Sequence, residues 1–288
     1  LLVKGFHGVA VATTVPFGLI AIFAPNPEKV NFDSRNVSLP LPAPLLHIFG
    51  TFCHLTMVCH ECICGYFVFA SLRDHGIIPA KPSSSGVSEQ AVRQEDLFFS
   101  GLHVASLFVL VVFWSAMVFD PLLFIDPEMM RFSHDTPRSV VYKTLFRMLW
   151  SPASGEEAGF FHFMRYIHTW STLLVTVEAA MVEHPLADWA SEAATLVSYC
   201  SKYLAWNLFT WWLLRHPPYP WQLQFCKRGV AQGLLAHGLC FVWAFALLTY
   251  SRAWRGSGGT LLGRVLLSLP LVAFVWASHG GFPMKSVL

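Results

Sequence analysis

The stretch "LLHIFGTFCHLTMVCHECICGYFVF", Leu45–Phe69, decides which class of fold the chain can adopt. It is apolar and long enough to cross a bilayer, yet it contains three histidines, a glutamate, four cysteines and two threonines. Polar groups in hydrocarbon cost free energy unless they find partners. The stretch therefore predicts a transmembrane helix whose polar residues serve metal binding, haem binding, nucleophilic catalysis or helix packing.

The composition extends this prediction to the whole chain. Of the 288 residues, 55% are hydrophobic and only 12% are charged, whereas soluble domains have about 25% charged residues. A polytopic membrane protein is therefore expected. The net charge of +2 and the lack of a basic run argue against a nucleic-acid partner. The seven cysteines are odd in number, and four of them crowd one apolar segment, which is not the pattern of a disulfide framework.

Seven apolar segments have about the 17–25 residues that a bilayer-spanning helix needs. Spanning segments must satisfy their backbone groups internally, which favours helices. We expect an all-α polytopic membrane helical bundle with six to seven transmembrane helices, forming a single transmembrane domain over residues 1–288. An interfacial amphipathic helix is also predicted near Ser139–Trp150. The seven segments are Phe6–Ala24, Pro44–Leu72, Leu97–Phe119, Gly159–Val182, Leu196–Leu214, Val230–Tyr250 and Leu261–Ser278.

Two polar residues fall at matching depths in the second and fourth segments, which should run in the same direction. Thr51 and His168 would both lie roughly 10–14 Å below the same membrane face, given a rise of 1.5 Å per residue. A histidine within hydrogen-bond reach can take the proton of a threonine hydroxyl as it attacks a carbonyl. Spacing alone leaves two simpler interpretations open, a threonine bonded to its own helix and a histidine bonding two helices.

Four stretches also occur in a distinctive order: "FGTFCHL", "LFVLVVFWSAMVFDP", "HTWSTLLVTVEAAMVEH" and "YLAWNLFTWWLLRHPPYPWQL", at 49–55, 107–121, 168–184 and 203–223. Together they resemble the androgen-induced protein family, which includes the androgen-dependent regulator of tissue factor pathway inhibitor. The resemblance covers a core of about 44–250. The segment at about 261–278 would be an extra C-terminal span, because the family usually has six.

The resemblance implies an intramembrane lipid-ester hydrolase. Members of the family use a threonine nucleophile and a histidine to cleave fatty acid esters of hydroxy fatty acids. Carried over by position, these roles fall on Thr51 and His168. The expected partners are membrane lipids, and no cofactor or metal is implied.

Other polar residues near this pair have supporting roles in the same interpretation. Glu178 matches a family position and is expected to be architectural, hydrogen-bonded to Asn207 or Trp206. Arg165 could hold a fatty-acid carboxylate, and His54 would flank the nucleophile. Oxyanion hydrogen bonds could come from Asn207, Ser171 or Thr172.

Metal and haem interpretations are weaker. A His-Glu-x-x-His zinc motif fails because residue 64 is a cysteine. Zinc bound by Cys53, His60 and Cys64 is geometrically conceivable, but Cys-x-x-Cys pairs in turns are missing. Haem with two histidine ligands has no repeated histidine spacing to support it. The candidate haem ligands are His54, His103, His168 and His237.

Two alternative functions therefore remain. The chain could be a catalytically silent accessory or structural subunit of a larger membrane protein complex, or a haem-binding membrane electron carrier. The family resemblance implies the endoplasmic reticulum or the plasma membrane. The mitochondrial inner membrane is the alternative location and suits the accessory subunit.

Overall fold

The computed structural model describes residues 2–23, 30, 33–35, 37–78, 89–119 and 166–256, and the short stretches 260, 263–264 and 268–269. All regular structure in these residues is helical, which confirms the all-α class. Three predictions lie outside the described residues, wholly or for the most part: the interfacial helix at Ser139–Trp150, the role of Arg165 and the span at Leu261–Ser278.

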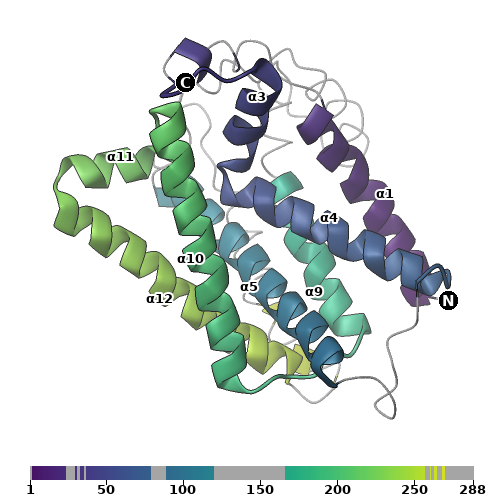
Figure 1. Ribbon diagram of the computed structural model, residues 1–288. Coiled ribbons are helices and arrows are strands. Elements are labelled where there is room, and N and C mark those ends of the chain that lie inside the picture. Colours follow the sequence, from purple (N-terminus) through teal and green to yellow (C-terminus); the bar gives the residue numbers. More distant parts are fainter. Residues whose placement is uncertain are drawn as a thin grey trace.

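The helices form a bundle around α5, which packs against α4, α9, α10 and α12, while α1 lies along α4 (Figure 1). A short π-helical turn, η2, leads directly into α9. The elements are α1 Leu2–Phe23, α3 Ala43–Phe52, α4 Leu55–Asp74, α5 Glu89–Phe119, η2 Tyr166–Trp170, α9 Ser171–Met181, α10 Trp189–Leu214, α11 Pro220–Lys227 and α12 Val230–Arg255.

Four helices in the described residues are long and apolar enough to cross a membrane: Leu2–Phe23, Leu55–Asp74, Gln94–Ala116 and Val230–Arg255. They correspond to four of the seven predicted segments. α10 has 26 residues but is not apolar enough to join them. The predicted count of six to seven is thus not confirmed, although a multi-pass membrane protein is supported.

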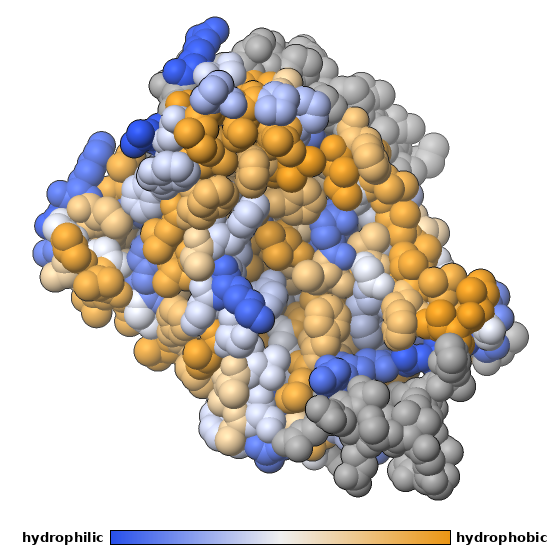
Figure 2. Space-filling view, in the orientation of Figure 1, coloured by the Kyte–Doolittle hydropathy of each residue, from blue (hydrophilic) through white to orange (hydrophobic). Residues whose placement is uncertain are grey.

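The outer surface also suits a bilayer. Figure 2 shows apolar residues over much of the visible face. α12 exposes large apolar side chains over its first half, and contiguous apolar surface of this kind is rarely left in water. These side chains are Val230, Leu234, Leu235, Leu239, Val242 and Trp243.

The predicted single helix over Pro44–Leu72 is wrong, because the chain breaks between α3 and α4. His54 adopts an extended backbone conformation, with φ −85° and ψ 129°. Backbone groups freed at such a break must find other partners when they are buried in apolar surroundings. Neither Gly nor Pro marks the break in the sequence, so the cause lies in distant contacts.

Those contacts come from α10 and the start of α11. The indole of Trp206 donates to the Phe52 carbonyl at 2.7 Å. The hydroxyl of Tyr203 donates to the carbonyl that follows, that of Cys53, at 2.9 Å. On the other side of the break, the N–H of Leu55 donates to the Tyr219 hydroxyl at 2.8 Å. The interrupted helix is therefore held open by side chains more than 100 residues away in sequence.

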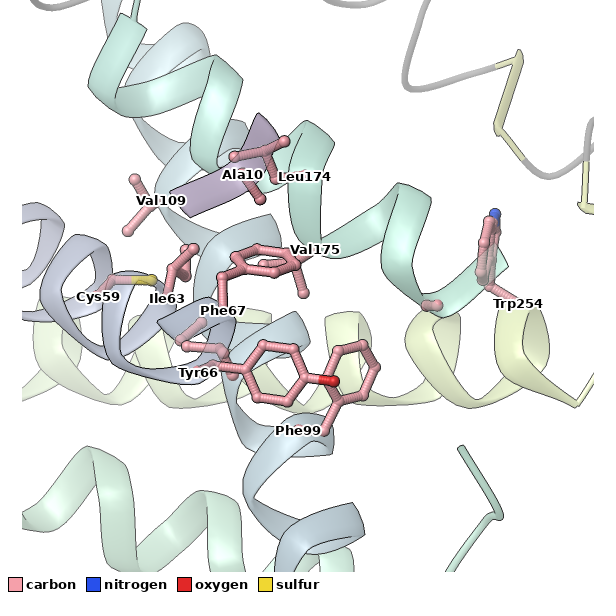
Figure 3. Packing of buried hydrophobic residues seen from close by; sticks show 13 residues of the cluster. Ala10, Cys59, Ile63, Tyr66, Phe67, Phe99, Val109, Leu174, Val175 and Trp254 are labelled. Atoms are coloured by element: carbon pink, nitrogen blue, oxygen red, sulfur yellow. The ribbon is translucent and has the colours of Figure 1, made fainter. Parts of the chain in front are cut away.

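The main hydrophobic core joins α1, α4, α5, α9 and α12 (Figure 3). Phe67 and Ile63 of α4 are fully buried in it, and the rings of Tyr66 and Phe99 lie 5.3 Å apart. The same core contains Val175 of α9. Burial of these side chains fixes α9, and the η2 turn that precedes it, against α4. That packing positions the polar residues described next.

Candidate functional site

A threonine and a histidine meet where α4 begins and η2 crosses it. The Oγ1 atom of Thr56, the second residue of α4, lies 3.0 Å from Nε2 of His168. Both residues are buried, with 9% and 6% of their surface exposed. The His168 ring stacks on Phe113 with a centroid distance of 3.6 Å. Stacking on Phe113 restricts the orientation of the imidazole, so Thr56 and His168 form a buried hydroxyl–imidazole pair of fixed geometry. The π-helical turn that holds His168 is a feature often found at functional sites.

The nucleophile expected from the sequence, Thr51, is not the partner of His168 in this hydrogen bond. Its hydroxyl lies 3.5 Å from Nδ1 of His47, one turn earlier in α3. Nε2 of His47 donates to the Ala21 carbonyl at 2.8 Å. The expected depths assumed one straight helix, and the break after α3 changes both the depth and the direction of every later side chain. The structure therefore moves the candidate nucleophile from Thr51 to Thr56.

Tyr219 completes the immediate surroundings of Thr56. Its hydroxyl accepts the Leu55 N–H and also hydrogen-bonds the hydroxyls of Thr56 and Tyr203. Burial raises the pKa of Tyr219 to about 12. The phenol therefore stays protonated at neutral pH and can donate a hydrogen bond beside the threonine.

Thr56 and His168 lie at the wall of a cavity of about 130 Å³. Side chains from α4, η2, α5, α10, α11 and α12 line it, and its surface is overwhelmingly apolar. Its apolar lining includes Leu55, Ala105, Phe108, Val112, Leu196 and Phe241. Ligand sites in proteins have this character, with a few polar groups fixing the orientation of an apolar ligand.

A line of hydrogen-bonded polar side chains from α10, α11 and α12 runs along the cavity wall, away from Thr56. Asn207 donates to the Tyr203 hydroxyl at 3.4 Å and accepts from Nε2 of Gln222 at 2.7 Å. The same Gln222 nitrogen lies 3.3 Å from Nε2 of His237, whose Nδ1 donates to the Gly233 carbonyl at 2.7 Å. Asn207, predicted as an oxyanion donor, thus lines the cavity but is occupied by neighbouring side chains.

Glu178 lies in a separate ionic cluster, as an architectural role would require. Its carboxylate accepts from the Tyr66 hydroxyl at 2.7 Å and lies 2.8 Å from Nε2 of His7. Nδ1 of His7 lies 2.7 Å from Asp74. The expected partners of Glu178, Asn207 or Trp206, are therefore wrong. Each ring nitrogen of His7 faces a carboxylate oxygen. When both carboxylates are ionised, the ring carries a proton on both nitrogens. His7 thus connects Asp74 of α4 to Glu178 of α9.

The remaining residues predicted near the pair have other contacts. Ser171 lies 3.0 Å from Nδ1 of His60. Thr172 donates to the Ser106 carbonyl. His54 packs edge-on against the Tyr219 ring, with centroids 5.5 Å apart. Ser171 and Thr172, two of the predicted oxyanion donors, are thus hydrogen-bonded to other groups. His54, predicted to flank the nucleophile, is the N-cap residue of α4, two residues before Thr56.

The described residues contain no group of three His, Cys, Asp or Glu side chains that could hold a metal ion. Of the histidines considered as haem ligands, His168 and His237 both line the cavity. Nε2 of each already faces a polar side chain, Thr56 and Gln222 respectively. His103 is hydrogen-bonded to Ser251 at 3.1 Å.

Sequence reasoning missed Thr56 and Tyr219. Thr56 is visible in the sequence only as a second threonine in the quoted stretch, and nothing local distinguishes it from Thr51. Tyr219 had a signal, the Tyr-Pro that closes a Trp-rich helix, because Pro220 starts α11 and makes Tyr219 its N-cap.

Comparisons with family models, with curated proteins and with solved structures found no match for this chain.

Proposed function

We propose that the protein is an intramembrane lipid-ester hydrolase in which Thr56 is the nucleophile and His168 the general base. The observation that carries the proposal is the 3.0 Å contact between Thr56 Oγ1 and His168 Nε2 at the wall of an apolar cavity. A nucleophile within hydrogen-bond reach of a base is the arrangement that acyl transfer needs. The family resemblance supports the same pair of residue types, with the threonine moved by five positions.

The reaction would proceed in two steps. In the first, Thr56 Oγ attacks the ester carbonyl while His168 Nε2 takes the hydroxyl proton. Collapse of the tetrahedral intermediate breaks the ester bond, and the leaving alcohol takes that proton from His168. In the second, a water molecule gives a proton to His168 and attacks the acyl carbonyl. The bond between the acyl carbon and the Thr56 oxygen breaks, that oxygen takes the proton from His168, and a fatty acid is released.

Tyr219 is suited to stabilise the charge that develops on the carbonyl oxygen. It contacts Thr56, stays protonated, and is held in place by the Leu55 N–H. A preorganised donor in a site that excludes water contributes strongly to such reactions. We assign it this role ahead of Asn207 because Tyr219 contacts Thr56 directly, whereas the amide of Asn207 bonds Tyr203 and Gln222.

The substrate would enter from the membrane. The cavity is apolar, and α12, which forms part of its wall, exposes an apolar outer surface. The resemblance proposes esters of hydroxy fatty acids as the substrate class, and the endoplasmic reticulum or plasma membrane as the location.

The test is labelling of the purified protein with a fluorophosphonate probe. Wild type should be labelled, Thr56→Ala and His168→Ala should lose the label, and Thr51→Ala should keep it. In a hydrolysis assay, His168→Ala should lower the rate by roughly 10²–10⁴-fold, the usual contribution of a general base. A folded wild type that neither labels nor hydrolyses any lipid ester would instead favour the silent accessory subunit.

A further inference from the structure

Two hydrogen-bond donors at the wall of the cavity have no partner in the described part of the chain. They are the hydroxyl of Tyr199 and the indole N–H of Trp221, and both atoms are buried. Buried polar groups in folded proteins are almost always hydrogen-bonded. An indole nitrogen can only donate. A ligand in the cavity could therefore supply the hydrogen-bond acceptor that these two side chains lack.

The two donors line the same cavity as the proposed catalytic residues. Tyr199 is one helical turn before Tyr203 on α10, so the two side chains share a face. Trp221 lies two residues after Tyr219, with its ring centroid 5.0 Å from that of His237. The donors thus come from different helices, next to but separate from the residues that would hold the ester at Thr56.

The residues that line the cavity constrain the charge of the ligand. Among the described residues that line it, none is Asp, Glu, Lys or Arg. His237 donates from Nδ1 to the Gly233 carbonyl, and its Nε2 faces the side-chain amide of Gln222. A charged group buried here would have no counter-ion among the described lining residues, which is strongly unfavourable. These residues therefore favour an uncharged group in the part of the ligand that enters the cavity.

We propose that the cavity binds an uncharged lipid ester that carries a second oxygen acceptor, with the chemistry of an acylglycerol. The inference rests on the proposed function for the position of the ester at Thr56. The second oxygen, a hydroxyl or a second ester, accepts from Tyr199 or Trp221. This departs from the substrate class that the resemblance proposes, because an ester of a hydroxy fatty acid ends in a free carboxylate, which would place a charge in or beside an uncharged cavity.

The test measures binding separately from catalysis. Three non-hydrolysable ethers of one chain length, a glyceryl ether, a methyl ether and a carboxymethyl ether, are titrated against Thr56→Ala protein in phosphatidylcholine nanodiscs. The glyceryl ether should bind roughly tenfold more tightly than either of the others, the effect of one or two satisfied buried donors. Tyr199→Phe and Trp221→Phe, each added to Thr56→Ala, should remove most of this preference. Tyr250→Phe and Trp243→Phe, which lie outside the cavity lining, should not.

Equal binding of the glyceryl and methyl ethers would overturn the inference, as would tighter binding of the carboxymethyl ether. Retention of the preference in both Phe variants would also overturn it. The wild type distinguishes this failure from that of the proposed function. Binding preference without hydrolysis of the matching ester would refute the hydrolase and leave the ligand class standing. Hydrolysis without any preference for the glyceryl ether would refute the inferred ligand class and leave the hydrolase standing.

Discussion

Replacing Glu178 by glutamine should destabilise the protein strongly without touching the proposed catalytic pair. Glu178 is only 1% exposed and receives a hydrogen bond from Tyr66, at 2.7 Å, while His7 lies 2.8 Å away. A glutamine retains one acceptor oxygen, but its NH₂ group would face a donor, and the His7 imidazolium would keep only Asp74. Breaking a buried ion pair by removing one partner costs about 3–5 kcal/mol.

The expected readout is a thermal melt followed with a thiol-reactive dye, since Cys53 and Cys59 are buried thiols that become reactive on unfolding. At 2–4 °C per kcal/mol, the melting temperature should fall by roughly 10 °C. The matched control is Glu183→Gln, an exposed glutamate in the loop after α9. It should change the melting temperature by no more than about 2 °C, as surface substitutions do.

A Glu178→Gln variant that melts like the control would refute the ionic bridge between α1, α4 and α9. The bridge also predicts that the effects are not additive. Adding His7→Ala to Glu178→Gln should cost less than the sum of the single changes, because each removes the same contact, with a coupling of about 0.5–3 kcal/mol. Strict additivity would mean that the two residues act independently.

Three further changes test the local structure of the helices that line the cavity. Tyr219→Phe leaves the buried Leu55 N–H without its acceptor and should destabilise the protein by about 1–3 kcal/mol, measurable in the same melt, while lowering ester hydrolysis; an unchanged melting temperature would mean that the α3–α4 break has other support. Gly229 joins α11 to α12 with φ 130°, and a Cβ there would lie 2.8 Å from Gln232, so Gly229→Ala should cost about 1–3 kcal/mol. Gly238→Ala, which meets nothing within 4 Å in the middle of α12, should instead stabilise by about 0.5–1 kcal/mol; equal effects of the two would contradict the expected strain at the α11–α12 hairpin.

The sequence was sufficient for the helical class and for the position of helices such as α1 and α12, because apolar length and a low charge content constrain both. It was not sufficient for the break between α3 and α4. No Gly or Pro stands at residues 52–55 to interrupt the helix. The break is stabilised by side chains of α10 and α11, and such contacts leave no local pattern.

The residues of the candidate site were also only partly predictable from the sequence. Depth and the family resemblance predicted a pair of Thr51 and His168. The structure instead brings Thr56 to within 3.0 Å of His168, because the chain breaks after α3. The catalytic roles stay predictions. The partners of Glu178 were wrong for a related reason: His7 is 171 residues away in sequence, and no spacing rule reports a contact at that distance.

The most direct test of the proposed catalytic pair is to locate the modified residue after probe labelling of the wild-type protein, by mass spectrometry of its peptides. Thr51 and Thr56 lie in the same stretch, so fragmentation must place the adduct on one or the other. The proposed mechanism predicts an adduct on Thr56 that disappears in His168→Ala. An adduct on Thr51, or one on Thr56 that persists without His168, would contradict it.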